Sequence, residues 1–500
     1  PEIGKAMQEY WTKMRIFERS MQIREGAKEF VFFEGPPSAN GKPGIHHVMA
    51  RSIKDIICRY HTLKGEYVYR KGGWDTHGLP VELGVEKNLG ITKEDIGKKI
   101  TVEEYNKACR NEVMKFKDMW DDVTQKMGYW VDLDDPYITF DNKYIESVWN
   151  LLSRLYEKDL LYKGYTIQPY SPAAGTGLSS HELNLPGCYK DVKDTTVVGQ
   201  FKVKNDQKSA FPWDLDALNV KMEELYFLAW TTTPWTLPSN TALAVGPKID
   251  YLLVKTFNPY SGKPVTVVLA KNLLGHFFSE KNSNLSFEDY KPGDKNIPYQ
   301  VLGETKGEKL VGIQYEQLIP YVKPEEGAFR VIPGDYVTTE DGTGIVHIAP
   351  TFGADDKRVA NDAGIPPLIM IDANGVAQPM VDKTGKFYKI EDLNPEFVKT
   401  NVNVELYGDV AGRYVKPDYE KEDEKHEESL DVYLAIWLKK ENSAFKVEKH
   451  THNYPHCWRT DKPVLYYPLD SWFVKTTAYK QRMIELNNTI KWKPQATGSG

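Results

Sequence analysis

Cysteine is scarce in the sequence, and so are long apolar runs. The four cysteines form neither a CxxC pair nor a disulfide framework; they are Cys58, Cys109, Cys188 and Cys457. This pattern is typical of the reducing cytoplasm, where we expect the protein to act. No apolar run approaches the roughly 20 residues that cross a bilayer, and no secretory leader is visible, so we expect no membrane association.

A strong charge of one sign is also lacking. The formal net charge of −6 argues against a general polyanion binder, although it is compatible with nucleic acid held by a local basic surface. The 500 residues exceed what one hydrophobic core supports, so we expect about two to four domains. Because the chain begins with Pro1 rather than Met and stops in a Gly/Ser/Thr-rich stretch, we expect a fragment.

The most informative stretch is FVFFEGPPSANGKPGIHHVMARSIKD, residues 30–55. Its first five residues, Phe30–Glu34, are apolar and rich in β-formers, which predicts a buried strand. Glycine, proline and asparagine then predict a turn, and apolar residues at helical spacing predict a helix from His46 onward, with Gly65 at its end. A strand, a glycine-rich turn and a helix together present backbone N–H groups and a positive helix end to phosphate.

A second glycine-rich loop, Gly72–Glu82 (GGWDTHGLPVE), follows an expected strand at Tyr67–Tyr69. Polar and acidic groups placed after a strand of an open α/β sheet are well placed to contact a ligand.

The texture of the chain changes twice. Residues 1–190 have an α/β pattern, residues 191–415 have short alternating runs separated by turns, and the α/β pattern returns in residues 416–500. The alternating runs predict strands at Val197–Val203, Leu225–Trp230, Leu252–Val254, Thr266–Leu269 and Ile345–Ile348. The sequence therefore predicts an α/β protein whose parent domain is interrupted by a β-rich insertion.

Five motifs give the chain a resemblance to the class I aminoacyl-tRNA synthetases. PPSANG before a histidine-rich helix start resembles the segment that carries the family's HxGH signature, and GGWDTHGLPVE is similar to the loop of the isoleucine-specific members. Two further stretches resemble the editing insertion of the Ile/Val/Leu group, and a last one resembles the return to the catalytic core; they are AWTTTPWTLPSNTALAV, GTGIVHIAPTFGADD and YPHCWR. The resemblance is collinear over nearly the whole chain.

The resemblance implies a Rossmann-type catalytic domain interrupted by a β-rich editing domain. It implies ATP-dependent activation of isoleucine, transfer to tRNA(Ile), Mg²⁺ with the ATP, and a monomer. Residues 1–190 would hold the N-terminal helix and the first catalytic half, residues 191–415 the editing insertion, and residues 416–500 the connector and the return. The family's KMSKS signature and anticodon-binding domain are not in these 500 residues.

The resemblance also assigns the activation site. The residues expected at ATP are Gly41, Gly44, Ile45, His46 and His47. Those expected around isoleucine are Pro36, Pro37, Gly73, Trp74 and Asp75, where Asp75 accepts the α-ammonium group because a fixed carboxylate suits a cation in a partly dry pocket.

One departure from the family stands in the activation site. The HxGH position reads Gly44-Ile45-His46-His47, so the first histidine and the glycine have changed places. Two interpretations follow: a working site with a rearranged turn, or an editing-only aminoacyl-tRNA deacylase with a degenerate activation site. We also expect the altered turn to weaken inhibitors that mimic the adenylate.

Editing follows from a physical limit, since a pocket gains only ~1–3 kcal/mol from the methylene that separates isoleucine from valine. The resemblance implies that Thr231, Thr232 and Thr233 orient the tRNA end and the water, and that Asn240 contacts the terminal adenosine. His347 would limit the size of the side-chain pocket. Asp356, favoured over Asp355 by its spacing from His347, would bind the substrate ammonium. Since the paired cysteines of some relatives are absent, we expect no zinc site.

Overall fold

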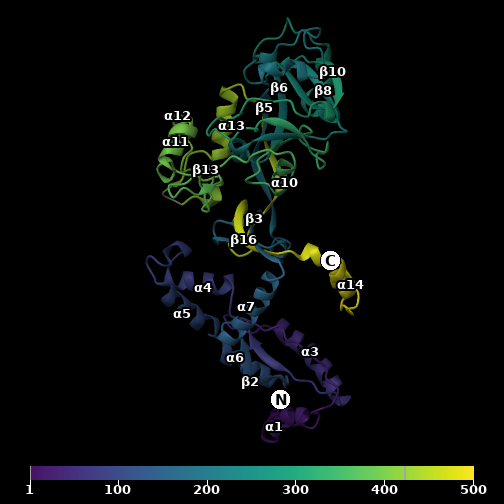
Figure 1. Ribbon diagram of the computed structural model, residues 1–500, viewed down its shortest axis with the longest axis vertical. Coiled ribbons are helices and arrows are strands. Elements are labelled where there is room, and N and C mark those ends of the chain that lie inside the picture. Colours follow the sequence, from purple (N-terminus) through teal and green to yellow (C-terminus); the bar gives the residue numbers. More distant parts are fainter. Residues whose placement is uncertain (1, 422–423, 500) are drawn as a thin grey trace. The chain divides into compact units, whose positions relative to one another are not determined.

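The computed structural model describes residues 2–421 and 424–499, so the parts of the expected blocks that fall on residues 1, 422, 423 and 500 lie outside it. The chain divides into two compact units (Figure 1): Pro1–Tyr162 with Trp472–Gly500, and Lys163–Ser471. The two boundaries fall within β3 (Leu161–Ser171) and β16 (Leu465–Val474), which belong to one sheet with β4 (Thr176–Gly177). No described helix is both long and apolar enough to cross a membrane.

The first unit is mostly helical. β1 (Lys71–Trp74) and β2 (Asp132–Ile138) form a parallel pair. The helices are α1 (Glu2–Lys13), α2 (Ile16–Gln22), α3 (Ile45–Leu63), α4 (Leu79–Leu89), α5 (Val102–Val113), α6 (Lys117–Lys126), α7 (Asn142–Tyr156) and α14 (Lys480–Asn487). The helix expected after the glycine-rich turn is confirmed as α3, and Gly65 follows its end with the positive φ that suits glycine.

Two strand predictions in this unit are wrong. Phe30–Glu34 is extended but forms no strand, because its backbone pairing stops at the hydrogen bond from Phe30 N–H to Tyr67 O, 2.9 Å long. Beyond that bond no described neighbour continues the ladder, and the Phe33 side chain is 88% exposed. Tyr67–Tyr69 likewise holds one isolated bridge, and the strand begins at Lys71, where β2 is available as a partner.

The second unit is built on a nine-stranded mixed sheet. Seven strands follow the order β10-β8-β9-β6-β12-β7-β11, while β5 pairs with β6 and β15 pairs with β5. The strands are β5 (Tyr189–Lys202), β6 (Leu225–Thr231), β7 (Ala242–Val245), β8 (Asp250–Phe257), β9 (Pro264–Ala270), β10 (Gln300–Lys306), β11 (Arg330–Pro333), β12 (Ile345–Ile348) and β15 (Ala444–Pro455). The five expected runs all lie in these strands apart from Val203, which forms an isolated bridge, so the β-rich texture is confirmed.

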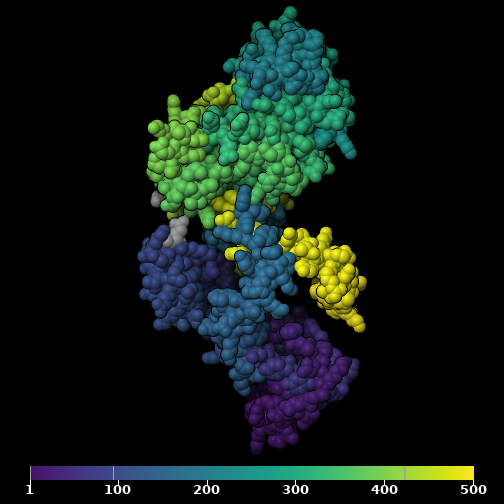
Figure 2. Space-filling view, in the orientation of Figure 1, coloured from purple at the N-terminus to yellow at the C-terminus, as the bar shows by residue number. Residues whose placement is uncertain are grey.

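Short helices and a small hairpin complete the second unit, most of which is the teal-to-green body in Figure 2. The helices are α8 (Ser180–Leu183), α9 (Leu274–Phe277), α10 (Ala354–Asp362), α11 (Pro395–Asn401), α12 (Val404–Tyr407) and α13 (Leu430–Lys440), with a hairpin of β13 (Met370–Ile371) and β14 (Ala377–Gln378). α13 packs against β5 and against the 3₁₀ helix η4 (Pro234–Ser239). Its buried face joins the main core, which positions α13 beside the loop after β6.

Candidate functional site

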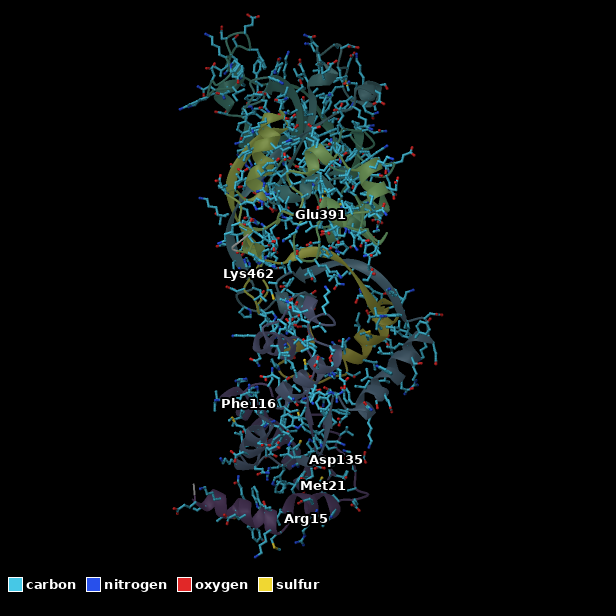
Figure 3. The ribbon with its side chains drawn as sticks, turned by 90° about the vertical axis from the view of Figure 1, so that its left-hand side faces the viewer. Arg15, Met21, Phe116, Asp135, Glu391 and Lys462 are labelled. Atoms are coloured by element: carbon cyan, nitrogen blue, oxygen red, sulfur yellow. The ribbon has the colours of Figure 1, made fainter. Side chains whose placement is uncertain are left out.

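The glycine-rich turn before α3 is held from the outside by α6. Phe116, labelled in Figure 3, donates its backbone N–H to Ala39 O at 2.9 Å. The Trp120 indole N–H donates to Gly41 O at 2.8 Å. Ala39, Trp74 and Trp120 form a buried cluster, so the turn rests on a small apolar core. This support fixes the backbone of the turn at the start of α3.

His47 has a defined tautomer. Its Nδ1 accepts the backbone N–H of Gly44 at 2.9 Å, so in the neutral ring the proton is on Nε2. Burial, His46 and Arg51 all lower the pKa of His47, which favours the neutral form of the ring. The Nε2–H is therefore a donor. The His47 ring packs edge-to-face with the Trp120 ring, and the two ring centres are 4.7 Å apart.

His46 is exposed and folds back over Gly44, with its ring centre 3.8 Å from that of His47. The exposed Ile45 is the first residue of α3. The backbone N–H groups of Ile45 and His46 have no partner among the described residues, as is usual in the first turn of a helix. The turn thus offers two imidazoles and two free amides at a positive helix end.

The second loop is tied to the first. Asp75 donates its backbone N–H to Pro37 O at 3.0 Å, while the neighbouring Pro36 is half-buried. The Asp75 carboxylate is exposed, and its only hydrogen bond to the described residues is a long 3.4 Å bond from His77 N–H. This carboxylate is therefore free to bind a cation beside the proline pair.

Gly73 is required by close packing. A β-carbon there would lie 2.4 Å from the Tyr137 ring. The Tyr137 hydroxyl donates to Glu34 O at 2.9 Å, which joins β2 to the segment leading into the first loop. Trp74, next in the chain, is buried in the core below, so it supports the loop from beneath.

The hydroxyl groups after β6 form a connected set. Thr231 Oγ1 accepts the Thr233 N–H at 3.1 Å and lies 3.3 Å from Thr233 Oγ1. Thr233 Oγ1 lies 3.3 Å from Thr236 Oγ1. Thr232 is half-buried and has no hydrogen bond from its hydroxyl to any described residue. Thr232 is thus the member of the trio whose hydroxyl is free for a ligand.

His347, on β12, lies against this set. Its Nε2 is 3.0 Å from Thr236 Oγ1 and its Nδ1 is 3.3 Å from Asn240 Nδ2. Because the amide nitrogen can only donate, Nδ1 accepts and the proton is on Nε2. Burial lowers the pKa of His347 to about 4, so the ring is neutral at neutral pH.

Asn240 is buried, and protein groups occupy its amide. Its Oδ1 accepts the Tyr315 hydroxyl at 2.7 Å, and its Nδ2 also donates to Ala242 O at 2.8 Å. Asn240 therefore holds the His347 ring from behind, and its amide has no free group turned to solvent.

Asp356 and its neighbour Asp355 lie in different surroundings. Asp356 is half-buried and accepts the Ala349 N–H at 2.8 Å, two residues beyond His347. Burial raises the pKa of Asp356 to about 6. Asp355 is exposed and pairs with Arg358 at 3.6 Å.

The structure thus brings the expected residues into two groups, one in each unit. Five supporting residues were missed by the sequence reasoning: Trp120, Tyr137, Thr236, Tyr315 and Asp431, whose carboxylate accepts the backbone N–H of Trp235 at 2.9 Å. Only Thr236 had a signal, since it lies inside the threonine motif; the others are distant in sequence from the residues they hold. Among the described residues, no cluster of three His, Cys, Asp or Glu side chains is arranged to bind a metal.

Comparison of the sequence with known proteins identifies its family. The model of "tRNA synthetases class I (I, L, M and V)" matches residues 6–499. The isoleucine–tRNA ligase of Bacteroides fragilis is 65% identical over 499 residues, covering 100% of this chain and 43% of that protein. Those of Porphyromonas gingivalis and Clostridium tetani are 63% and 42% identical, covering 98% and 100% of this chain and 42% and 40% of their own lengths.

The chain therefore spans less than half the length of the curated relatives it matches. Because the family model covers nearly every residue, the chain belongs to the class I tRNA synthetases of the isoleucine, leucine, methionine and valine group.

Proposed function

We propose that the protein to which this chain belongs activates isoleucine with ATP and transfers it to tRNA(Ile). We further propose that its second unit hydrolyses valyl-tRNA(Ile). The naming of relatives at 63–65% identity as isoleucine–tRNA ligases supports the substrate.

One observation carries the activation half of the proposal. The bond from Asp75 N–H to Pro37 O brings a free carboxylate beside the loop that leads into α3. The carboxylate would hold the isoleucine ammonium group, while the substrate carboxylate attacks the α-phosphate of ATP and pyrophosphate leaves. Pro36 and Pro37 would shape the side-chain pocket, and the buried Trp74 would support its wall from beneath.

The start of α3 would stabilise the negative charge of the transferring phosphate. The Nε2–H of His47 and the free amides of Ile45 and His46 are donors already oriented by the turn, and preorganised donors are worth most in catalysis. The turn Gly41–Gly44 would approach the phosphates, with Mg²⁺ arriving on ATP at the pyrophosphate side.

The connected threonine hydroxyls after β6 support the proposed hydrolysis of valyl-tRNA(Ile). Thr232 would contact the tRNA terminus or the attacking water, while Thr231 and Thr233 hold the loop in place. The neutral His347 would limit the pocket to side chains smaller than isoleucine, and Asp356 would bind the ammonium group. We assign Asn240 to holding His347, because its amide is engaged within the protein.

Isoleucine-dependent exchange of pyrophosphate into ATP by the full-length protein tests activation. Exchange is expected, and its absence together with valine release from valyl-tRNA would favour the editing-only deacylase instead.

The remaining expectations are part of the same proposal. We propose a Rossmann-type catalytic fold, supported here by the parallel pair β1–β2, interrupted by an editing domain near residues 191–415. We also propose a cytoplasmic monomer that uses Mg²⁺ with ATP and has no zinc in these residues.

A further inference from the structure

A buried carboxylate from a distant helix holds the threonine loop. Asp431 is in the first turn of α13 and is 5% exposed. Its Oδ1 accepts the backbone N–H of Trp235 at 2.9 Å, across 196 positions of sequence. Trp235 is the second residue of η4, where a helical N–H has no partner within its own helix and needs one from outside.

In the sequence, the Trp235 amide lies between Thr233 and Thr236, two members of the connected hydroxyl set. Thr233 precedes Trp235 by two residues, and Thr236 follows it directly. Thr236 Oγ1 donates to Thr233 O at 2.8 Å and lies 3.0 Å from His347 Nε2. A shift of the Trp235 backbone would therefore move both hydroxyls and break the contact of Thr236 with His347.

Charged groups from three other segments act on Asp431: two lysines attract it and one carboxylate repels it. Lys416, 4% exposed, lies before the 3₁₀ helix η9 (Pro417–Tyr419) and attracts Asp431 electrostatically, as does Lys449 of β15. Asp194 of β5 opposes them, but its carboxylate is bound by Lys416 Nζ at 2.8 Å and by His452 Nε2 at 3.2 Å. Burial raises the pKa of Asp431 to about 7 and the two lysines oppose this rise, while the bond from Trp235 N–H gives the carboxylate a hydrogen-bond partner.

We propose that Asp431 is a positioning residue of the hydrolytic centre: its carboxylate anchors the Trp235 N–H and so fixes Thr236 between Thr233 and His347. The inference rests on the proposed hydrolysis of valyl-tRNA(Ile). Asp431 touches no reacting atom in this account, and it acts through the backbone of η4.

The test compares Asp431→Ala with Asp431→Asn in the full-length protein. The alanine variant loses the acceptor, whereas the asparagine oxygen can still accept the Trp235 N–H. We expect Asp431→Ala to lower kcat for valine release from valyl-tRNA(Ile) at least ~10-fold with KM changed less than about 2-fold, since small displacements of a catalytic group are costly. Asp431→Asn should stay within ~3-fold of the unmodified protein. If the alanine variant fails to fold, leucine replaces it, because leucine fills the volume without an acceptor.

Asp409→Ala is the matched control. Asp409 is exposed and accepts the hydroxyl of Tyr433 on the same helix at 3.0 Å, so its loss perturbs α13 without touching the Trp235 N–H. This variant should keep full activity. Equal losses in Asp409→Ala and Asp431→Ala, or full activity of Asp431→Ala, would overturn the inference.

Hydrogen exchange of the peptide 231–240 separates this inference from the proposed function. Faster exchange in Asp431→Ala than in Asp431→Asn is expected even if the protein hydrolyses no ester. Failure of the unmodified protein to release valine would contradict the proposed function alone. Equal exchange in the two variants would contradict the proposal that Asp431 holds the Trp235 N–H.

Discussion

The His46 imidazole folds back over Gly44, so that a β-carbon at position 44 would lie 2.9 Å from His46 Cε1 and 3.0 Å from its Nδ1. The small residue and the displaced histidine therefore depend on each other. The exchange of glycine and histidine relative to HxGH is compensated within one turn, which favours a working activation site over a degenerate one.

The first prediction follows from this dependence. Gly44→His alone should displace the exposed His46 ring and slow isoleucine-dependent pyrophosphate exchange by about 10-fold, through disturbance of oriented donors. The double variant Gly44→His/His46→Gly should recover most of the rate and bind adenylate-mimicking inhibitors more tightly. Equal inhibitor potency in the double variant and the unmodified protein would contradict the expectation that the altered turn weakens these inhibitors.

The second prediction concerns Asp75. Asp75→Asn should raise the KM for isoleucine by roughly 10- to 150-fold and leave the KM for ATP unchanged, because a hydrogen bond to a charged group contributes about 1.5–3 kcal/mol. Asp135→Asn is the control: Asp135, labelled in Figure 3, is an exposed carboxylate that pairs with Lys71 at 2.8 Å. A parallel change in both variants would argue against a specific role for Asp75.

The third prediction concerns the stability of the first unit. Gly73→Ala should destabilise it by about 1–3 kcal/mol, because the added methyl group would collide with the Tyr137 ring. Gly84→Ala, on α4, adds a methyl group with no atom within 4 Å and should stabilise the helix by about 0.5–1 kcal/mol. Thermal unfolding of the two variants gives the comparison, and a Gly73→Ala protein as stable as Gly84→Ala would contradict the packing.

The fourth prediction is a pH dependence from His347. Its pKa is about 4 in the folded chain, below the ordinary value of 6.5. Between these values the unfolded chain binds a proton that the folded chain does not, so stability falls as the pH is lowered from 6.5 to 4, by about 3 kcal/mol. Urea unfolding of the second unit should show this loss, and His347→Gln should lack it. An identical pH dependence in both proteins would show that His347 is not held neutral.

Local patterns predicted much of the fold. β12 was expected at Ile345–Ile348 and lies there, because its short run of β-branched residues finds strand partners on both sides, β6 and β7. Phe30–Glu34 had the same strand composition, yet pairing depends on a neighbour that composition does not reveal.

The candidate site was less predictable than its motifs. Motif spacing favoured Asp356 over Asp355 as the ligand of the substrate ammonium, which stays a prediction; that Asp356 accepts the Ala349 N–H could not be read from the sequence. The roles of Tyr315 and Asp431 could not be predicted, since each reaches the site from more than 70 positions away through tertiary packing. Asn240 is a similar case. The motif predicted that it is a site residue, but the groups that hydrogen-bond its amide come from tertiary packing.

The central claim is that one site makes the activated amino acid and a second site destroys the wrong product. Formation of AMP by the full-length protein with valine, ATP and tRNA(Ile) tests both sites at once. We predict sustained AMP formation, stimulated by the tRNA, without accumulation of valyl-tRNA. Accumulation of one valyl-tRNA per AMP would show that hydrolysis does not occur, and no AMP with either valine or isoleucine would show that activation does not.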